Sequence, residues 1–198
     1  MKKLISLLLV LVMAMSVLAG CAETPAQTEA TEPSTEATEA VVVPESALEI
    51  MENTWAAFPE DKKFPVGGGD MVTNTSFEGP ALFDLKEVDG LTYQLQVPAD
   101  QVANLDDAAT MIHGMLLNNF ASGALHVTGD VDAFVETMHE AIANAQWMCG
   151  FPEKMLIAVV GGEYVVVAYG LNDNVNPFET ALTEAYPDTV VKYSEAIG

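Results

Sequence analysis

Cationic side chains are almost absent from this sequence. Its 198 residues include no Arg and only seven Lys, against 29 Asp and Glu, which gives a formal net charge of -22. Nucleic-acid binding needs clustered cations that neutralise phosphates, so the composition excludes a nucleic-acid partner. Recognition of phosphorylated ligands by an Arg fork is excluded as well. The negative charge should also repel anionic lipid headgroups, so we expect the domain to stand off a membrane surface.

Cysteine and long apolar runs are also scarce. The chain has two cysteines, Cys21 and Cys149. If Cys21 carries a lipid, as argued below, no internal disulfide can form, and the hydrophobic core alone must stabilise the fold. The apolar run from Leu4 to Leu18 is shorter than the roughly 20 residues that a spanning helix needs. No second long apolar run follows, so we expect the rest of the chain outside the bilayer.

Residues 1–20 have the arrangement of a secretory signal peptide. Lys2 and Lys3 precede the apolar run, and small residues follow it. The ending Leu18-Ala19-Gly20-Cys21 resembles the lipobox of bacterial lipoproteins. That resemblance implies that Cys21 receives a diacylglyceryl thioether and becomes the mature N-terminus. The chain would then be exported and anchored by lipid to the outer face of the bacterial cell membrane.

Residues 21–44 have the composition of a tether. From Ala22 to Ala40 the chain holds only Ala, Glu, Thr, Pro, Gln and Ser. A segment without large apolar side chains cannot form a core, and repeated Glu residues repel one another, so we expect this tether to be disordered. Residues 45–198 remain, and this length suits a single globular domain with its own hydrophobic core.

Residue patterns predict the elements in the first half of the domain. The capping box Ser46-x-x-Glu49 and apolar residues at helical spacing indicate a helix over 46–57. The Gly-rich stretch 64–70 is typical of a mobile loop. We further expect one irregular helical turn near 80–85, a short strand or extended lead over 91–97, and a largely helical segment over 100–120.

The second half has clearer signals. Asp130 caps a long amphipathic helix that reaches about Trp147, and Asn176-Pro177 starts a last helix that ends before Pro187. We expect strands over 123–128, 155–160 and 163–169, with the hairpin turn Gly161-Gly162 between the last two. These elements predict an α+β fold with a small antiparallel sheet of three to four strands. The C-terminal half would have β-α-β-β-α order, and helices would cover mainly one face.

Two patterns contain metal-ligand types. Met111-Ile112-His113-Gly114-Met115 offers thioether and imidazole groups suited to copper, but on a helix His113 would point away from both Met side chains. Met at such spacing is usually core filler. Residues 172–176 carry oxygen ligands at alternating positions, yet they lack the Gly and Glu of an EF-hand loop. We therefore assign no metal and no cofactor.

Histidines and one cysteine are the remaining candidates for chemistry. His113, His126 and His139 occur among many carboxylates, which leaves acid–base catalysis open. No serine-elbow, zinc-helix or Ser-x-x-Lys motif is present. Cys149 follows an aromatic and a Met residue, which favours a buried inert thiol. Gly67-Gly68-Gly69 lacks the Lys-Ser/Thr ending of a phosphate loop, so we interpret it as a hinge or a loop. We assign no catalytic residue.

The order of elements also carries a resemblance. The motifs are Ala124-Leu125-His126-Val127, then Gln146-Trp147 at the end of a long helix, then Gly162-Glu163-Tyr164-Val165-Val166. With a short helix before them, they make the region from about Ala47 to Pro187 resemble a family of small Gram-positive-type lipoproteins of unknown function. The resemblance implies an exported, anchored domain without assigned catalytic residues.

The sequence leaves three functions open. We expect a non-enzymatic, membrane-anchored extracytoplasmic lipoprotein whose domain binds another envelope protein or an extracellular ligand. The first alternative is a small-solute or metal-binding lipoprotein that serves a transporter. The second alternative is a hydrolase that uses His and carboxylates.

Overall fold

The computed structural model describes residues 44–148 and 150–198. The expected signal peptide, Cys21 and the tether up to residue 43 lie outside the described residues, as does Cys149. Among the residues that are described, no helix is both long and apolar enough to cross a membrane.

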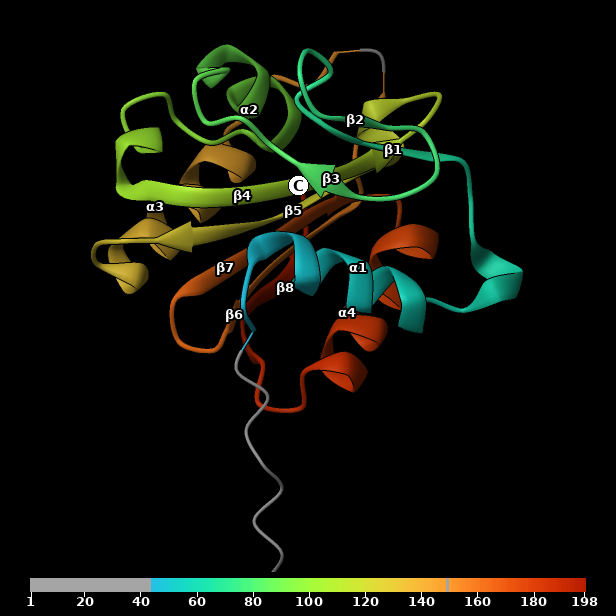
Figure 1. The fold of residues 1–198 in the computed structure, drawn as a ribbon. Coiled ribbons are helices and arrows are strands. Elements are labelled where there is room, and N and C mark those ends of the chain that lie inside the picture. Colours follow the sequence, from blue (N-terminus) through green and yellow to red (C-terminus); the bar gives the residue numbers. More distant parts are fainter. Residues whose placement is uncertain (1–43, 149) are drawn as a thin grey trace, which may run out of the picture. The chain divides into compact units, whose positions relative to one another are not determined.

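An antiparallel sheet of eight strands forms the centre of the domain (Figure 1). The strands are β1 (Val66–Gly69), β2 (Thr75–Ser76), β3 (Ala81–Leu82), β4 (Leu105–His113), β5 (Phe120–Val127), β6 (Lys154–Val160), β7 (Tyr164–Gly170) and β8 (Val190–Ala196). Their order in the sheet is β2-β1-β4-β5-β7-β6-β8, with β3 paired to β4. The chain is therefore an α+β protein, but the expectation of three to four strands was too low.

Helices cover both faces of the sheet. On one face lie α1 (Ala47–Ala57) and α4 (Asn172–Ala185), and on the other lie α2 (Val88–Leu95) and α3 (Val131–Ala143) (Figure 1). Three short 3₁₀ turns complete the domain: η1 (Glu60–Lys62), η2 (Val102–Asn104) and η3 (Leu117–Asn119). The prediction that helices cover mainly one face was wrong.

Strand β7 shows why both faces need a cover. Val166 and Ala168 belong to the core beneath α1 and α4. Val165, Val167 and Tyr169 belong to the core beneath α2 and α3. Successive side chains of a strand point to opposite faces, so an apolar residue at every position produces two hydrophobic faces. Each face then needs its own layer of helices to exclude water.

Helix α1 confirms the prediction for 46–57. The Ser46 side chain accepts a hydrogen bond from the Glu49 N–H at 3.1 Å, as an N-cap does. The Glu49 carboxylate in turn accepts from the Glu45 N–H at 2.6 Å. Two backbone donors at the start of the helix are thus satisfied by local side chains.

Four predictions for the first half of the domain were wrong. The stretch 64–70 contains buried strand β1, and 80–85 contains β3 in place of a helical turn. Residues 91–97 belong mostly to helix α2, and 100–120 contains strand β4. In the three strands, contacts distant in sequence decided the local conformation.

The close approach of neighbouring backbone explains why β1 contains glycines. A Cβ added at Gly68 would lie 2.5 Å from the Ala81 nitrogen and 2.6 Å from the Thr110 oxygen. Real Cβ atoms do not approach backbone atoms so closely, so only glycine fits between these segments. A Gly-rich stretch normally indicates a loop, whereas here it allows a strand to pack tightly.

Strand β4 forms although its sequence has a high helix propensity. Residues 105–113 include Ala and Met, which are good helix formers, yet the segment pairs with β5 on one side and with β1 and β3 on the other. In α2, by contrast, Leu91 and Leu95 are both fully buried and lie one helical turn apart. The alternation of residues from Leu91 to Val97 suggested the two-residue period of a strand, whereas the buried residues repeat with the period of a helix.

The second half agrees better with its predictions. Strands β5, β6 and β7 occupy the expected positions. Gly161 (φ 61°) and Gly162 (φ 83°) lie in the hairpin turn as predicted, but the turn also includes Glu163, so it has three residues instead of two. Helix α3 starts after Asp130 as predicted but ends at Ala143 instead of about Trp147. Strand β8 was not predicted.

Helix α4 begins five residues earlier than expected, and Pro177 lies inside it. Asn172 is its first residue, and the Asn172 N–H donates to the Glu153 carboxylate at 2.9 Å. A side chain from outside the helix therefore satisfies an N-terminal donor. Local sequence does not reveal this kind of cap, which is why Asn176 was the wrong choice.

Candidate functional site

The three histidines lie in three separate places. His113 is the last residue of β4, and its ring stacks on Phe64 with centroids 5.1 Å apart. Its Nδ1 accepts a hydrogen bond from the Met115 N–H at 3.1 Å. Burial lowers the pKa of His113 because the charged ring would lose hydration. The imidazole therefore helps to order the β4–β5 loop.

His126 lies in β5, toward the opposite end of the sheet. Its Nδ1 pairs with the Asp106 carboxylate, and its Nε2 lies 3.5 Å from the Glu163 carboxylate. The hydrogen bond to Asp106 raises the pKa of His126 and outweighs the opposing effect of burial, with a further contribution from Glu163. The ring also packs against Tyr164 at 4.6 Å between centroids.

His139 lies on α3 and contacts strand β8. Its Nε2 is 2.7 Å from the Glu195 carboxylate, and its ring stacks on Tyr193 with centroids 3.9 Å apart. Each histidine thus has its own partners on different elements. The structure brings no two of them into one site, and His126 is the one that has two carboxylates beside it, those of Asp106 and Glu163.

The metal-ligand patterns are also separated by the fold. Met111 is fully buried in the core, whereas Met115 is 79% exposed in the β4–β5 loop. Asn174 donates to the Asn119 carbonyl at 3.0 Å, and Asn176 accepts from the Lys154 ammonium at 2.7 Å. Within 44–148 and 150–198, no three His, Cys, Asp or Glu side chains are grouped so that they could hold a metal ion.

Asp70 is a buried residue that the sequence analysis missed. Its carboxylate accepts six hydrogen bonds from Val72, Thr73, Asn74 and Asp84. Burial alone would raise the pKa of Asp70, but these hydrogen bonds hold it far below its usual range. All donors come from the chain between β1 and α2, so this carboxylate organises that segment. The only sequence signal was an Asp directly after a Gly-rich stretch.

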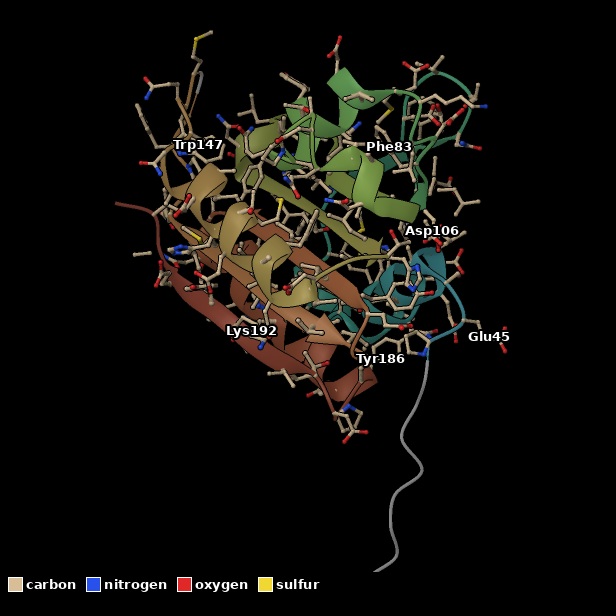
Figure 2. All side chains as sticks on the ribbon, turned by 90° about the vertical axis from the view of Figure 1, so that its left-hand side faces the viewer. Glu45, Phe83, Asp106, Trp147, Tyr186 and Lys192 are labelled. Carbon is tan, nitrogen blue, oxygen red and sulfur yellow. The ribbon has the colours of Figure 1, made fainter. Side chains whose placement is uncertain are left out.

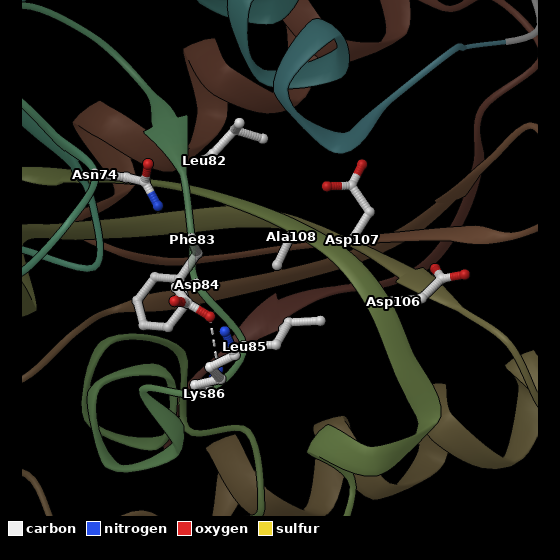
Figure 3. Close-up of a pocket in the computed structure, with 9 residues that line it drawn as sticks. All are labelled: Asn74, Leu82, Phe83, Asp84, Leu85, Lys86, Asp106, Asp107 and Ala108. Carbon is white, nitrogen blue, oxygen red and sulfur yellow. Dashed lines mark hydrogen bonds between the residues drawn. The ribbon is translucent and has the colours of Figure 1, made fainter.

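An acidic hollow of about 470 Å³ lies between β4 and the chain that follows β3 (Figure 3). Asp84, Asp106 and Asp107 line it, together with Lys86 and apolar side chains that include Leu82. Asp107 also accepts a hydrogen bond from the Ala47 N–H at 2.7 Å, which links the hollow to the start of α1. The hollow could hold a small cationic solute.

Large apolar side chains are exposed on two neighbouring loops. We define the distal surface as Met115, Leu116, Met148 and Phe151, which are exposed by 79%, 50%, 78% and 77%. The first pair belongs to the β4–β5 loop and the second pair to the α3–β6 loop. The Asn118 amide joins the loops, because it donates to the carbonyls of Met148 (2.9 Å) and Gly150 (3.0 Å).

A smaller hollow of about 310 Å³ adjoins the distal surface. Trp147 and Phe151 line it, together with Pro152 and Ile197. The Trp147 ring packs on Tyr169 with centroids 4.9 Å apart, which fixes the inner wall of the hollow. The volume lies at the small end of the range for ligand sites and suits one large apolar side chain.

The distal surface lies far from the point where the chain enters the domain. Pro44 packs on the β6–β7 turn, since a Cβ at Gly161 would lie 2.9 Å from its Cδ atom. Phe151 shortly precedes β6, and Gly161 directly follows it. The seven residues of β6 separate the two ends by about 23 Å at roughly 3.3 Å per residue. In Figure 2, Trp147 and Glu45 accordingly lie on opposite sides of the molecule.

Comparisons with known proteins provide no relative. The chain matches no model of a known protein family, no curated protein and no solved structure. The functional proposals below therefore rest on the residues and geometry of this chain.

Proposed function

We propose that this chain is an exported, lipid-anchored domain that binds another protein of the cell envelope through the distal surface. The observation that carries the proposal is the exposure of Met115, Leu116, Met148 and Phe151 on two loops joined by Asn118. Lipid on Cys21 would anchor it to the outer face of the membrane. The domain itself acts as a non-enzymatic binding module.

Exposed apolar side chains of this size are typical of interfaces. Met and aromatic residues are enriched in protein–protein interface cores, where charged residues are depleted. Exposed apolar surfaces that are rimmed by polar groups often mark sites of protein–protein interaction. Among these residues, Phe151 also lines the adjacent hollow, so an apolar side chain of a partner could enter beside it.

The position of the distal surface suits a partner above the membrane. The chain enters the domain at Pro44, at the far end of β6. A disordered tether from residue 22 to residue 43 would exceed the roughly 23–28 Å root-mean-square length of a Gly-rich coil, because its Glu residues repel one another. Because the distal surface lies at the other end of β6 from Pro44, the tether would leave it open to other envelope proteins.

Site-specific photocrosslinking in the host cell tests this proposal. A photoreactive amino acid is placed at Leu116 in the full chain, and crosslinked partners are compared with those from a photoreactive group at Phe77. Phe77 is a matched control because it is 81% exposed but lies on the β2–β3 connection. We expect one defined crosslinked protein from position 116 only.

Substitutions make the outcome decisive. Met148→Ser and Phe151→Ser together should abolish the crosslink from position 116, whereas Phe77→Ser should leave it unchanged. Because both side chains are exposed, unfolding free energy should change by less than about 0.5 kcal/mol. The absence of a defined crosslink, or a crosslink that survives the double substitution, would refute the proposal.

A small-solute function is the second candidate, and the acidic hollow favours it. Three Asp side chains and one Lys line the hollow, which would select a small cationic amine. Binding at 100 times the dissociation constant adds about 2.7 kcal/mol, which should raise the melting temperature by several degrees. A titration with a short aliphatic diamine, with a matched diol as control, would reject this candidate if both leave the melting temperature unchanged.

A further inference from the structure

Strand β8 forms one edge of the sheet. Within the residues that the structure describes, no strand pairs with its outer side. The Ile197 N–H donates to the Glu153 carbonyl at 3.0 Å, and hydrogen-bonding direction alternates along an antiparallel strand. The N–H and C=O groups of Ser194 and Ala196 therefore point away from β6. They form a short open template for another strand.

Helix α3 lies beside this edge and runs in the same direction. Lys192 pairs with Asp132 at 2.9 Å, at the start of both elements. The Tyr193 hydroxyl then donates to the Glu136 carboxylate at 2.7 Å. Further along, Glu195 pairs with His139 (Figure 2 faces this side, with Lys192 labelled). The order of these contacts shows that the helix and the strand run side by side in the same direction.

An acidic stripe on α3 follows the edge. Asp132, Glu136 and Glu140 are exposed and occur at every fourth position, which places them about 6 Å apart along the helix axis. Alternate residues of a β-strand that point to one face are about 6.6–6.8 Å apart. Cations at alternate positions of an added strand would therefore match the spacing of these carboxylates.

Positive charge near the edge is already neutralised. Helix α3 contains no Lys or Arg, and Lys192, the sole cation of β8, pairs with Asp132. Among the described residues, Glu136 and Glu140 are the carboxylates of the stripe that form no ion pair. Carboxylates also lie near the edge on the opposite face of the sheet, where the Ser194 hydroxyl donates to the Glu179 carboxylate at 2.8 Å. Two more carboxylates, those of Asp130 and Asp132, line a hollow of about 290 Å³ at the start of β8, beside Val190.

We propose that the outer edge of β8 accepts an extended segment of a partner protein as an additional strand, with Lys or Arg at alternate positions facing the acidic stripe of α3. Backbone hydrogen bonds to Ser194 and Ala196 would hold the segment, and the charges would select it. A register shift at Lys192 interrupts the edge, so pairing is confined to its second half.

The charges favour a basic partner over a second copy of this chain. A second copy would bring its own acidic stripe, and the chain as a whole has a formal net charge of -22. Like charges across an interface cost free energy, whereas a basic segment gains from the same field. This surface uses other residues than the distal surface: the acidic stripe lies on α3, whereas Met148 and Phe151 lie on the loop after its end, beside a hollow that Ile197 also lines.

The test uses the full chain in detergent and a short peptide, acetylated and amidated, in which Lys and Val alternate. We expect saturable binding by calorimetry and new hydrogen-exchange protection at the Ser194 and Ala196 amides. A peptide of the same composition with its Lys residues grouped at one end should bind more weakly. The Tyr193 and Glu195 amides already face β6, so their protection should change little.

Two variants separate backbone pairing from charge. Ala196→Pro removes an outward N–H without touching the β6 ladder and should weaken binding about 3- to 10-fold. Glu136→Gln with Glu140→Gln should weaken binding about 2- to 30-fold, at the usual strength of exposed ion pairs. The matched control, Glu52→Gln with Asp61→Asn, removes the same charge from exposed positions outside α3 and should change binding less than about twofold.

Several outcomes would overturn this inference. Equal weakening by both charge variants, with no effect of Ala196→Pro, would show that the peptide binds by diffuse attraction only. The absence of saturable binding would also overturn it. Concentration-dependent dimerisation that Ala196→Pro abolishes would identify a second copy as the occupant and overturn the basic partner. Replacing Met148 and Phe151 by Ser should not alter peptide binding, so failure here is distinguishable from failure at the distal surface.

Discussion

Asp70 offers the sharpest test of how this fold is held together. It is only 5% exposed. One carboxylate oxygen accepts from the N–H groups of Val72, Thr73 and Asn74 at 2.7, 2.6 and 3.0 Å. The other accepts from the Thr73 hydroxyl, the Asn74 amide and the Asp84 N–H at 3.0, 2.8 and 3.1 Å. The carboxylate therefore ties the turn after β1 to the segment after β3.

The substitution Asp70→Asn keeps one oxygen and turns the other into a donor. The three hydrogen bonds to that second oxygen are lost, and a hydrogen bond to a charged group contributes about 1.5–3 kcal/mol. Because the donors are only partly buried, water can satisfy some of them in the variant. We therefore expect the free energy of unfolding to fall by about 2–4 kcal/mol at pH 7.

The depressed pKa of Asp70 determines how the stability difference between the wild type and Asp70→Asn changes with pH. Hydrogen bonds hold the pKa of Asp70 in the folded state far below its usual value of about 3.9. A depressed pKa contributes stability that is complete above the unfolded-state pKa and is lost as the pH falls toward the folded-state pKa. The difference between the wild type and Asp70→Asn should therefore be largest at pH 7 and should shrink below about pH 4.

Urea unfolding followed by tryptophan fluorescence at pH 7 and at pH 3 provides the measurement. Glu52→Gln is the control, because Glu52 is an exposed carboxylate on α1. That variant should match the wild type to within about 0.5 kcal/mol at both pH values. If Asp70→Asn behaves like Glu52→Gln, or if its deficit is the same at both pH values, the assigned role of the carboxylate is refuted.

Two further predictions concern His126 and Gly68. The pairing with Asp106 raises the pKa of His126, so its contribution is complete below the unfolded-state pKa of about 6.5 and is lost as the pH rises through the folded-state pKa. His126→Gln should thus be less stable than the wild type at pH 6, by less than about 1 kcal/mol, and equal to it at pH 9 by urea unfolding. Gly68→Ala should cost about 3 kcal/mol or more in thermal unfolding, because its Cβ would meet backbone on two sides. Gly129→Ala is the control, since nothing lies within 4 Å of that Cβ; equal costs would contradict the packing argument.

Sequence patterns were reliable where the signal is local. The N-cap at Ser46 formed as predicted, and the hairpin turn formed at Gly161-Gly162 although it is one residue longer than predicted, because the interacting groups are only a few residues apart. The N-cap at Asp130 formed in the same way, with its side chain accepting from the Ala133 N–H at 3.0 Å. Each of these features is decided by side-chain hydrogen bonding or by glycine backbone freedom.

Prediction failed where distant contacts decide. Gly68 marks a strand because Ala81 and Thr110 close on it, and no neighbouring residue signals that approach. Asn172 starts α4 because Glu153 accepts its N–H from another element. Strand β8 contains exposed residues on both faces, so it has no clear alternation to recognise. Its strand state comes from pairing with β6.

The residues of the candidate surfaces are visible in the sequence, but their exposure and alignment depend on contacts distant in sequence. Met115 and Phe151 are apolar in sequence and would pass for core residues, and only the fold shows that they are exposed. The acidic repeat on α3 is visible in sequence, but its alignment with β8 requires Lys192 and Tyr193 to lie beside the helix.

The sequence by itself determined the strong negative charge, the α+β class and the local helix and turn signals, because composition and short-range hydrogen bonds do not depend on the rest of the fold. Only the tertiary structure decided that the sheet has eight strands, that both faces are covered, and which side chains remain exposed. The physical reason is that strand pairing and burial join residues far apart in the chain, so their free energy is absent from any local window of sequence.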